Sequence, residues 1–152
     1  MVGRAPKHKI LITDYVWPST VPEREVLAEL DADIVESDSG DEDRLVELAA
    51  DVTGILTCFA KVTEKVVRAS PRLGVVGRYG VGTDNIAVDV CSELDIPVTY
   101  VPDSGSEDVA DHALALLIAI SRGIATLHSH FPHSEWSPKP TIPVPRSWVP
   151  TL

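Results

Sequence analysis

The sequence predicts an α/β fold built on a parallel sheet, and three observations support that prediction. Short β-branched stretches alternate with helix-like patterns from the N-terminus to about residue 101, which is typical of consecutive βα units. The 152 residues are enough to enclose one core of ordinary size. The two cysteines, Cys58 and Cys91, lack a metal-type spacing, so we expect the core to form without a disulfide or a zinc site.

Five strands and four helices are expected in alternation. The strands are expected at residues 9–13, 32–36, 53–57, 73–76 and 98–101. The helices between them are expected at about residues 22–30, 42–50, 63–69 and 87–94. Thr20 and Glu23 have capping-box spacing at the first helix, with Pro22 in its first turn. This order predicts a flavodoxin-like doubly wound parallel sheet, whose ligands bind beyond the carboxyl ends of the strands.

A longer helix of a different kind is expected at residues 104–122. Ser104 and Glu107 again have capping-box spacing, and Gly123 is placed to end the helix. Because the helix is apolar on almost every side, it must be covered on more than one side. One small sheet cannot do this, so we expect the helix to bind a second copy, giving a homo-oligomer, or a partner domain.

The remaining sequence predicts a tail. Residues 131–152 contain six prolines and no periodic pattern, as in extended linkers. We therefore expect three parts: an α/β domain at 1–103, an interdomain or dimerisation helix at 104–130, and a Pro-rich tail at 131–152.

The charge and hydropathy of the chain exclude several classes of partner. There are 23 acidic and 13 basic residues, giving a net charge of −10, with no Lys/Arg cluster. Nucleic acid is therefore not an expected partner. The apolar run at Ile10–Ile12 is too short for a signal peptide, and the most apolar stretch, Ala113–Ile120, is too short to span a bilayer. We expect a cytoplasmic protein with no membrane partner.

A glycine-rich loop follows the fourth expected strand. Gly77, Gly80 and Gly82 stand between a strand and a helix, where such turns present backbone N–H groups to an anion. We expect glycine there because a side chain would block close approach and forbid a positive φ. The spacing is G-x-x-G-x-G, whereas a dinucleotide fingerprint is G-x-G-x-x-G. From its residues alone, the loop could be a phosphate cradle or a bare turn without a ligand.

Two blocks in this order resemble a known family. The stretches Pro71–Ile86 and Gly105–Leu117 are similar to the strand-loop-helix segment and the long interdomain helix of the D-isomer-specific 2-hydroxyacid dehydrogenases, which include phosphoglycerate dehydrogenases and the C-terminal-binding-protein corepressors. The resemblance covers about residues 9–136. It implies that 1–103 is the substrate-binding (catalytic) domain, and that an NAD-binding domain would begin where the tail stands. The implied reaction is hydride transfer between NAD or NADP and a small 2-hydroxy or 2-oxo acid.

The resemblance also implies which residues meet the substrate. Backbone amides of two loops would hold its carboxylate, and these loops contain Cys58, Phe59, Ala60, Gly80, Val81 and Gly82. Several N–H donors converging on a carboxylate orient it for hydride transfer. Val81 would also lie near the cofactor, and Asp108 and Val109 would approach the nicotinamide.

The family's catalytic Arg, Glu and His, and its G-x-G-x-x-G segment, do not occur at matching positions in this sequence. We therefore expect no catalytic residue in this chain and no dehydrogenase activity from the chain alone. The alternative is a non-catalytic binding or dimerisation domain that pairs with itself or with a full-length relative.

The histidines offer two further candidates. His128, His130 and His133 form a short cluster that could bind zinc or nickel, or could be a solvated helix end. His112, beside Asp111, could serve as a general base, or could be a packing or interface residue.

Three other side chains are candidates at the ends of strands. Asp14 and Asp103 end strands at the expected ligand edge, although acidic residues also favour turns and caps. Cys58 as a nucleophile would need a nearby base, and the sequence shows none.

Overall fold

The computed structural model describes residues 7–130. The segment expected as a Pro-rich tail, with His133, lies outside the described residues. The chain divides into two compact units, Met1–Ser104 and Gly105–Leu152.

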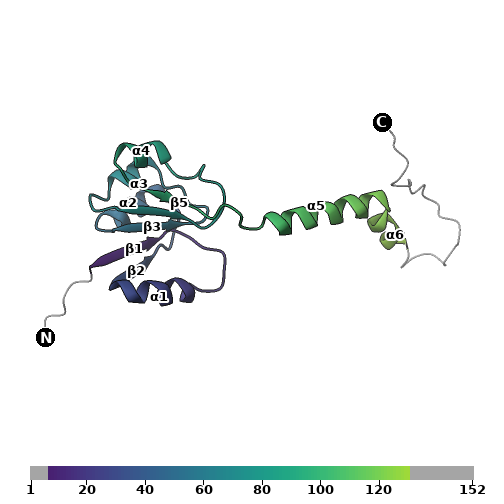
Figure 1. Cartoon of the computed structure of the whole chain (residues 1–152), viewed down its shortest axis with the longest axis horizontal. Coiled ribbons are helices and arrows are strands. Elements are labelled where there is room, and N and C mark those ends of the chain that lie inside the picture. The colour runs from purple at the N-terminus through teal and green to yellow at the C-terminus, as the bar shows by residue number, and fades with distance from the viewer. Residues whose placement is uncertain (1–6, 131–152) are drawn as a thin grey trace. The chain divides into compact units, whose positions relative to one another are not determined.

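The first unit is a five-stranded parallel sheet with helical crossovers (Figure 1). Its elements in chain order are β1 (His8–Ile12), α1 (Val21–Leu27) with a 3₁₀ turn (Ala28–Leu30), β2 (Ala32–Glu36), α2 (Glu42–Ala49), β3 (Gly54–Thr57), α3 (Glu64–Arg68), β4 (Val75–Arg78), α4 (Val88–Glu93) and β5 (Val98–Thr99). The strand order is β2-β1-β3-β4-β5, with every pair parallel. This order confirms the predicted flavodoxin-like sheet.

Two strands differ by two residues from their expected positions, and β1 and β3 differ by one residue. β4 begins at Val75 and continues to Arg78, which pairs with Thr57. The strand was expected two residues earlier, but Leu73 is buried and the amide of Gly74 donates to the Thr53 carbonyl (2.9 Å) before the ladder begins. β5 ends at Thr99, because only its two residues pair with β4.

Both predicted capping boxes are wrong. Thr20 lies at the N-cap of α1 without a side-chain cap; its hydroxyl donates to Glu36 Oε1 (2.6 Å) and accepts from Arg24. Glu36 of β2 has therefore replaced Glu23, the partner expected within the helix. The long helix begins at Ser106, where Gly105 caps it in the left-handed conformation (φ 77°) and no side chain caps it.

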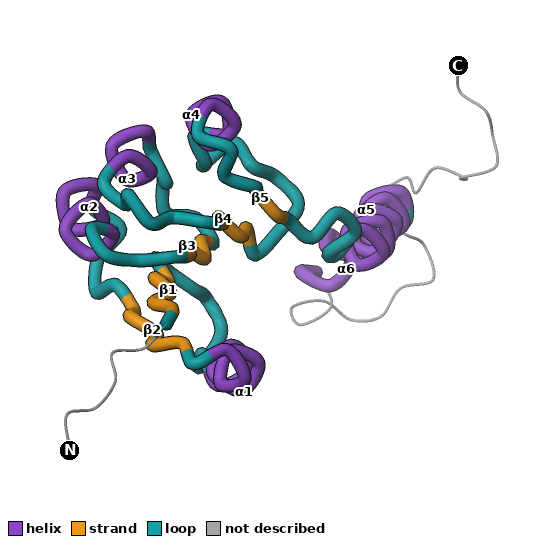
Figure 2. Tube along the Cα trace, turned by 60° about the vertical axis from the view of Figure 1, so that its left-hand side comes forward, coloured by secondary structure: helices purple, strands orange, loops and turns teal. Residues whose placement is uncertain are grey.

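The helices cover the two faces of the sheet unequally. Figure 2 shows α2, α3 and α4 on one face and α1 on the other. The core lies on the three-helix face, where strand residues such as Leu11, Ile55 and Val76 pack against helix residues such as Leu45 and Val66. Cys91 is buried in the same core, and both cysteines are free thiols. Burial on this face orders the sheet and so positions its carboxyl edge.

The second unit contains α5 (Ser106–Ser121) and α6 (Ile124–His130). Gly123, with φ 62°, ends the long helix as predicted. The large apolar side chains of α5 are 49–77% exposed; they are Val109, Leu114, Leu116, Leu117, Ile118 and Ile120. The partner expected to cover this helix, a second copy or a partner domain, therefore stays a prediction. None of the described helices has the length and apolar character needed to cross a bilayer.

Candidate anion-binding site at the carboxyl edge of the sheet

Two loops meet at the carboxyl ends of β3 and β4. These strands are parallel neighbours, so the segments that follow them leave the sheet side by side. The Tyr79 amide donates to the Thr57 carbonyl (2.9 Å), and the Val62 amide donates to the Asn85 carbonyl (2.9 Å). The sheet topology therefore brings together the loop containing Cys58, Phe59 and Ala60 and the loop containing Gly80, Val81 and Gly82.

Asn85 and Arg78 join the two loops through their side chains. Asn85 Nδ2 donates to the Ala60 carbonyl (2.9 Å), and its Oδ1 accepts from Arg78 Nε (3.1 Å). The Arg78 guanidinium also lies over the Phe59 ring, 5.8 Å from its centroid, within the range of a cation–π contact. The two loops thus form one connected edge.

The glycines of the second loop allow neighbouring side chains to approach the backbone closely. They do not adopt an unusual backbone conformation. None of Gly77, Gly80 and Gly82 has a positive φ, so that part of the prediction is wrong. A Cβ at Gly77 would lie 2.7 Å from Leu56 Cδ2, and one at Gly80 would lie 3.0 Å from Arg78 Nη1. The side chains of Leu56 and Arg78 therefore fold against the backbone at Gly77 and Gly80.

The second loop presents unpartnered backbone amides. Within residues 7–130, the N–H groups of Gly80, Val81 and Gly82 donate no hydrogen bond, and the Val81 side chain is 48% exposed. Exposed N–H groups without a protein partner are open to a bound anion.

A cation lies beside Gly80, because a Cβ at that residue would lie 3.0 Å from Arg78 Nη1. The Arg78 guanidinium uses Nε for Asn85, and no carboxylate in the described part of the chain forms an ion pair with it. Sequence reasoning did not single out Arg78, although its position between Gly77 and Gly80 could have indicated it.

The amides of the first loop already have a carboxylate partner. Asp14 accepts from the Cys58 amide (2.9 Å, Oδ1) and from the Phe59 amide (2.7 Å, Oδ2), and Thr13 Oγ1 adds a third hydrogen bond (2.8 Å). Burial raises the pKa of Asp14, but these hydrogen bonds outweigh burial and hold the pKa below its ordinary value. Asp14 therefore caps this loop. An added anion would have to displace it or bind at Gly80–Gly82.

The remaining candidates are placed as follows. Cys58 is 4% exposed, and burial together with the charge of Asp14 raises the pKa of its thiol, which disfavours the nucleophilic thiolate. Asp103 lies in the turn before α5. Asp108 and Val109 begin α5 in the second unit, so their approach to a nicotinamide stays a prediction.

The histidine candidates all belong to the second unit. His112 is exposed on α5, His128 is exposed on α6, and α6 ends at His130. Over the part of the chain that the structure describes, no three metal-ligating side chains are grouped.

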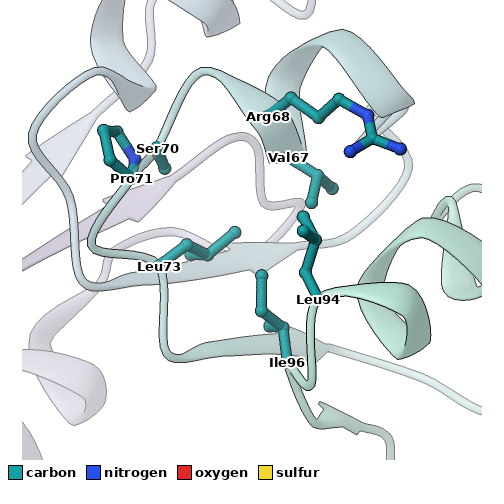
Figure 3. Close-up of a pocket in the computed structure, with 7 residues that line it drawn as sticks. All are labelled: Val67, Arg68, Ser70, Pro71, Leu73, Leu94 and Ile96. Carbon is teal, nitrogen blue, oxygen red and sulfur yellow. The ribbon is translucent and has the colours of Figure 1, made fainter.

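The hollow in Figure 3 lies at the opposite end of the strands. It is formed by residues that precede β4 and β5 and by the end of α3, with Val67, Leu73, Leu94 and Ile96 directed toward one another. The Arg68 guanidinium points outward and is paired with Glu64 and Glu93. This hollow lacks a free polar group to orient a substrate, so the carboxyl edge remains the better candidate.

The sequence matches a family model over residues 10–139: the catalytic domain of the D-isomer specific 2-hydroxyacid dehydrogenases. The chain belongs to this family. It is 33% identical over 128 residues to the D-3-phosphoglycerate dehydrogenase of Mycobacterium tuberculosis, a match that covers 84% of this chain and 24% of that protein. A D-3-phosphoglycerate dehydrogenase of Synechocystis is 29% identical over 135 residues, covering 88% of this chain and 24% of the relative.

Solved structures of family members share the fold. D-lactate dehydrogenase from Aquifex aeolicus, complexed with NAD and lactic acid, superimposes with a TM-score of 0.68 at 25% identity, covering 84% of this chain and 39% of that one. The NADPH-dependent glyoxylate/hydroxypyruvate reductase of Sinorhizobium meliloti, in complex with citrate, superimposes with a TM-score of 0.72 at 28% identity. The match covers 91% of this chain and 42% of that one. The chain of this family member spans about a quarter of the length of the two phosphoglycerate dehydrogenases.

Proposed function

We propose that this domain binds the carboxylate of a small 2-hydroxy or 2-oxo acid as the substrate side of an NAD(P)-dependent dehydrogenase. The observation that carries the proposal is the row of unpartnered amides at Gly80, Val81 and Gly82 beside the Arg78 guanidinium. Charge-assisted hydrogen bonds from several donors fix both the position and the plane of a carboxylate. The lactic acid and NAD held by the Aquifex relative support the substrate and cofactor class.

The residues present do not form a nucleotide site. The 152 residues contain no G-x-G-x-x-G segment, and the helix after the free amides, α4, has only six residues. NAD or NADP would be held by another domain and would supply or accept the hydride. On this side, Val81 would contact both the acid and the nicotinamide, Cys58, Phe59 and Ala60 would shape the substrate's side-chain end, and Asp108 and Val109 would approach the nicotinamide.

Titration with sodium D-lactate tests the anion site. We expect the backbone amide signals of Gly80, Val81 and Gly82 to shift in ¹H–¹⁵N NMR spectra, because their N–H groups would donate to the carboxylate. Neutral lactamide at the same concentration should leave them in place. Arg78→Ala should weaken D-lactate binding roughly 10-fold or more, since hydrogen bonds to charged groups contribute about 1.5–3 kcal/mol.

Arg72→Ala is the matched control, because Arg72 lies outside the loop and, among the described residues, donates only to the Lys7 carbonyl (3.4 Å). Equal shifts with D-lactate and lactamide, or no shift in the three amides, would contradict the proposal.

A second function, association through α5, is favoured by the exposure of its large apolar side chains. Apolar patches of this kind mark interaction surfaces. We expect light scattering at micromolar concentration to show a dimer or larger species, with a second copy or a full-length relative covering the helix. Replacing Leu117 and Ile120 with serine should shift the chain toward monomer, whereas Val26→Ser on α1 should not. A monomeric wild-type chain would rule out self-association.

A further inference from the structure

We propose that Tyr79 is a positioning residue that holds the Gly80–Gly82 loop in its anion-binding geometry, supported by Trp17 and Glu23 from the segment around α1. The consequence for binding rests on the proposed function, whereas the ordering of the loop does not. The proposal stands on the packing of the Tyr79 ring, on the burial of its hydroxyl and on the single hydrogen bond that the loop backbone makes within the described residues.

The loop cannot be ordered by its own amides if these are to bind a ligand. Its backbone has one hydrogen bond among the described residues, from the Val101 amide to the Gly80 carbonyl (3.1 Å). The loop must therefore be held by the residues that precede and follow it. Arg78 ends β4, and Tyr79 lies between this strand and the loop.

The Tyr79 ring is fixed by an aromatic neighbour. The rings of Trp17 and Tyr79 meet edge to face, with centroids 4.6 Å apart and planes at 78°. Tyr15 continues the cluster, with its ring centroid 5.9 Å from that of Trp17. Edge-to-face aromatic pairs stabilise a fold beyond what the area they bury contributes. Because Gly80 directly follows Tyr79, this packing fixes the start of the loop.

We expect the hydroxyl of Tyr79 to make a second contact, with Glu23 of α1. Its oxygen and Glu23 Oε2 are both buried, and neither has a hydrogen-bond partner in the described part of the chain. Burial, and after it the negative charge of Glu23, raises the pKa of Tyr79. A buried donor is stabilised when it bonds to a buried acceptor, and a hydrogen bond from Tyr79 to Glu23 would join the loop to α1.

The segment that carries Trp17 is itself anchored to β2. Glu36 accepts hydrogen bonds from Tyr15 (3.0 Å), Thr20 (2.6 Å) and Arg24. Three contacts to one carboxylate fix the entry into α1, and Trp17 lies between the first two of them in the chain. Glu36 therefore anchors the segment that contains Trp17, Trp17 packs against Tyr79, and Tyr79 directly precedes the loop.

Backbone ¹⁵N relaxation of the full chain tests this role without any ligand. In the wild type we expect order parameters of about 0.85 at Gly80, Val81 and Gly82. Trp17→Leu should lower them to below about 0.6, the range of flexible backbone, because the edge contact to Tyr79 is lost. Tyr79→Phe keeps the ring and should cause a smaller decrease, and Glu23→Gln should stay near the wild-type values because its amide oxygen still accepts.

D-lactate titration of the same variants provides the second readout. Trp17→Leu should weaken binding about 10-fold, equivalent to 1.4 kcal/mol, and Tyr100→Phe, an exposed tyrosine in the first unit, is the matched control. Unchanged order parameters in both Trp17→Leu and Tyr79→Phe would overturn the proposal. A loop that loosens in these variants while the wild type fails to bind D-lactate would support the positioning role and refute the proposed function.

Discussion

Leu11→Ala is expected to lower the free energy of unfolding by about 2–5 kcal/mol. Leu11 lies in β1, paired with Val35 and Ile55 on either side, and is 0% exposed in the core. Truncation removes buried apolar atoms and leaves a cavity between the sheet and its three helices. Since domains are stable by about 5–15 kcal/mol, the loss is a large fraction of the total. Urea unfolding followed by far-UV circular dichroism measures it.

Val26→Ala is the control for this measurement. Val26 is also a branched apolar residue, but it is 71% exposed on α1, so its truncation should change stability by less than about 0.5 kcal/mol. Equal effects of the two substitutions would show that the core does not lie where the structure places it.

Asp14→Ala is the second substitution expected to have a large effect. It removes the acceptor for the Cys58 and Phe59 amides, and hydrogen bonds to charged groups contribute about 1.5–3 kcal/mol, with solvent at this partly exposed site favouring the lower value. Asp14→Asn keeps one oxygen acceptor and should lose less. Asp33→Ala, an exposed aspartate of β2, should be neutral. The free energies of unfolding of these three variants, measured in urea at pH 7, test the prediction.

The effect of Asp14 should also depend on pH. Its pKa is lowered in the folded state, so its contribution is fully present above the unfolded value of about 3.9 and is lost as the pH falls through the folded pKa. The stability difference between wild type and Asp14→Ala should therefore shrink as the pH falls below about 4. A difference that stays constant over this range would contradict the assignment of Asp14 as an ionised cap.

Asp14→Ala also tests the prediction that the first loop binds the carboxylate of a substrate. Removing Asp14 frees the amides of Cys58 and Phe59. If these amides are able to hold an external carboxylate, D-lactate should shift their signals in Asp14→Ala and leave them in place in the wild type.

Some features could be predicted because they are encoded by neighbouring residues. The alternation of β-branched and helical stretches predicts the five strands, and the left-handed Gly123 ends the long helix as its position indicated. The closeness of the two loops also follows, once β3 and β4 are parallel neighbours. The capping boxes at Thr20 and Ser104 look equally local, yet neither forms.

The sequence alone determined the α/β class, the glycine loop and the two family blocks, because these patterns lie within short stretches. Only the tertiary structure decided that Thr20 bonds to Glu36 and that Asp14 occupies the amides of a loop 45 residues away. It also showed that the loop glycines provide space for Leu56 and Arg78 and do not need a positive φ. Such pairings depend on which strands become neighbours. That choice is made by burial of the whole sheet and not by any local pattern.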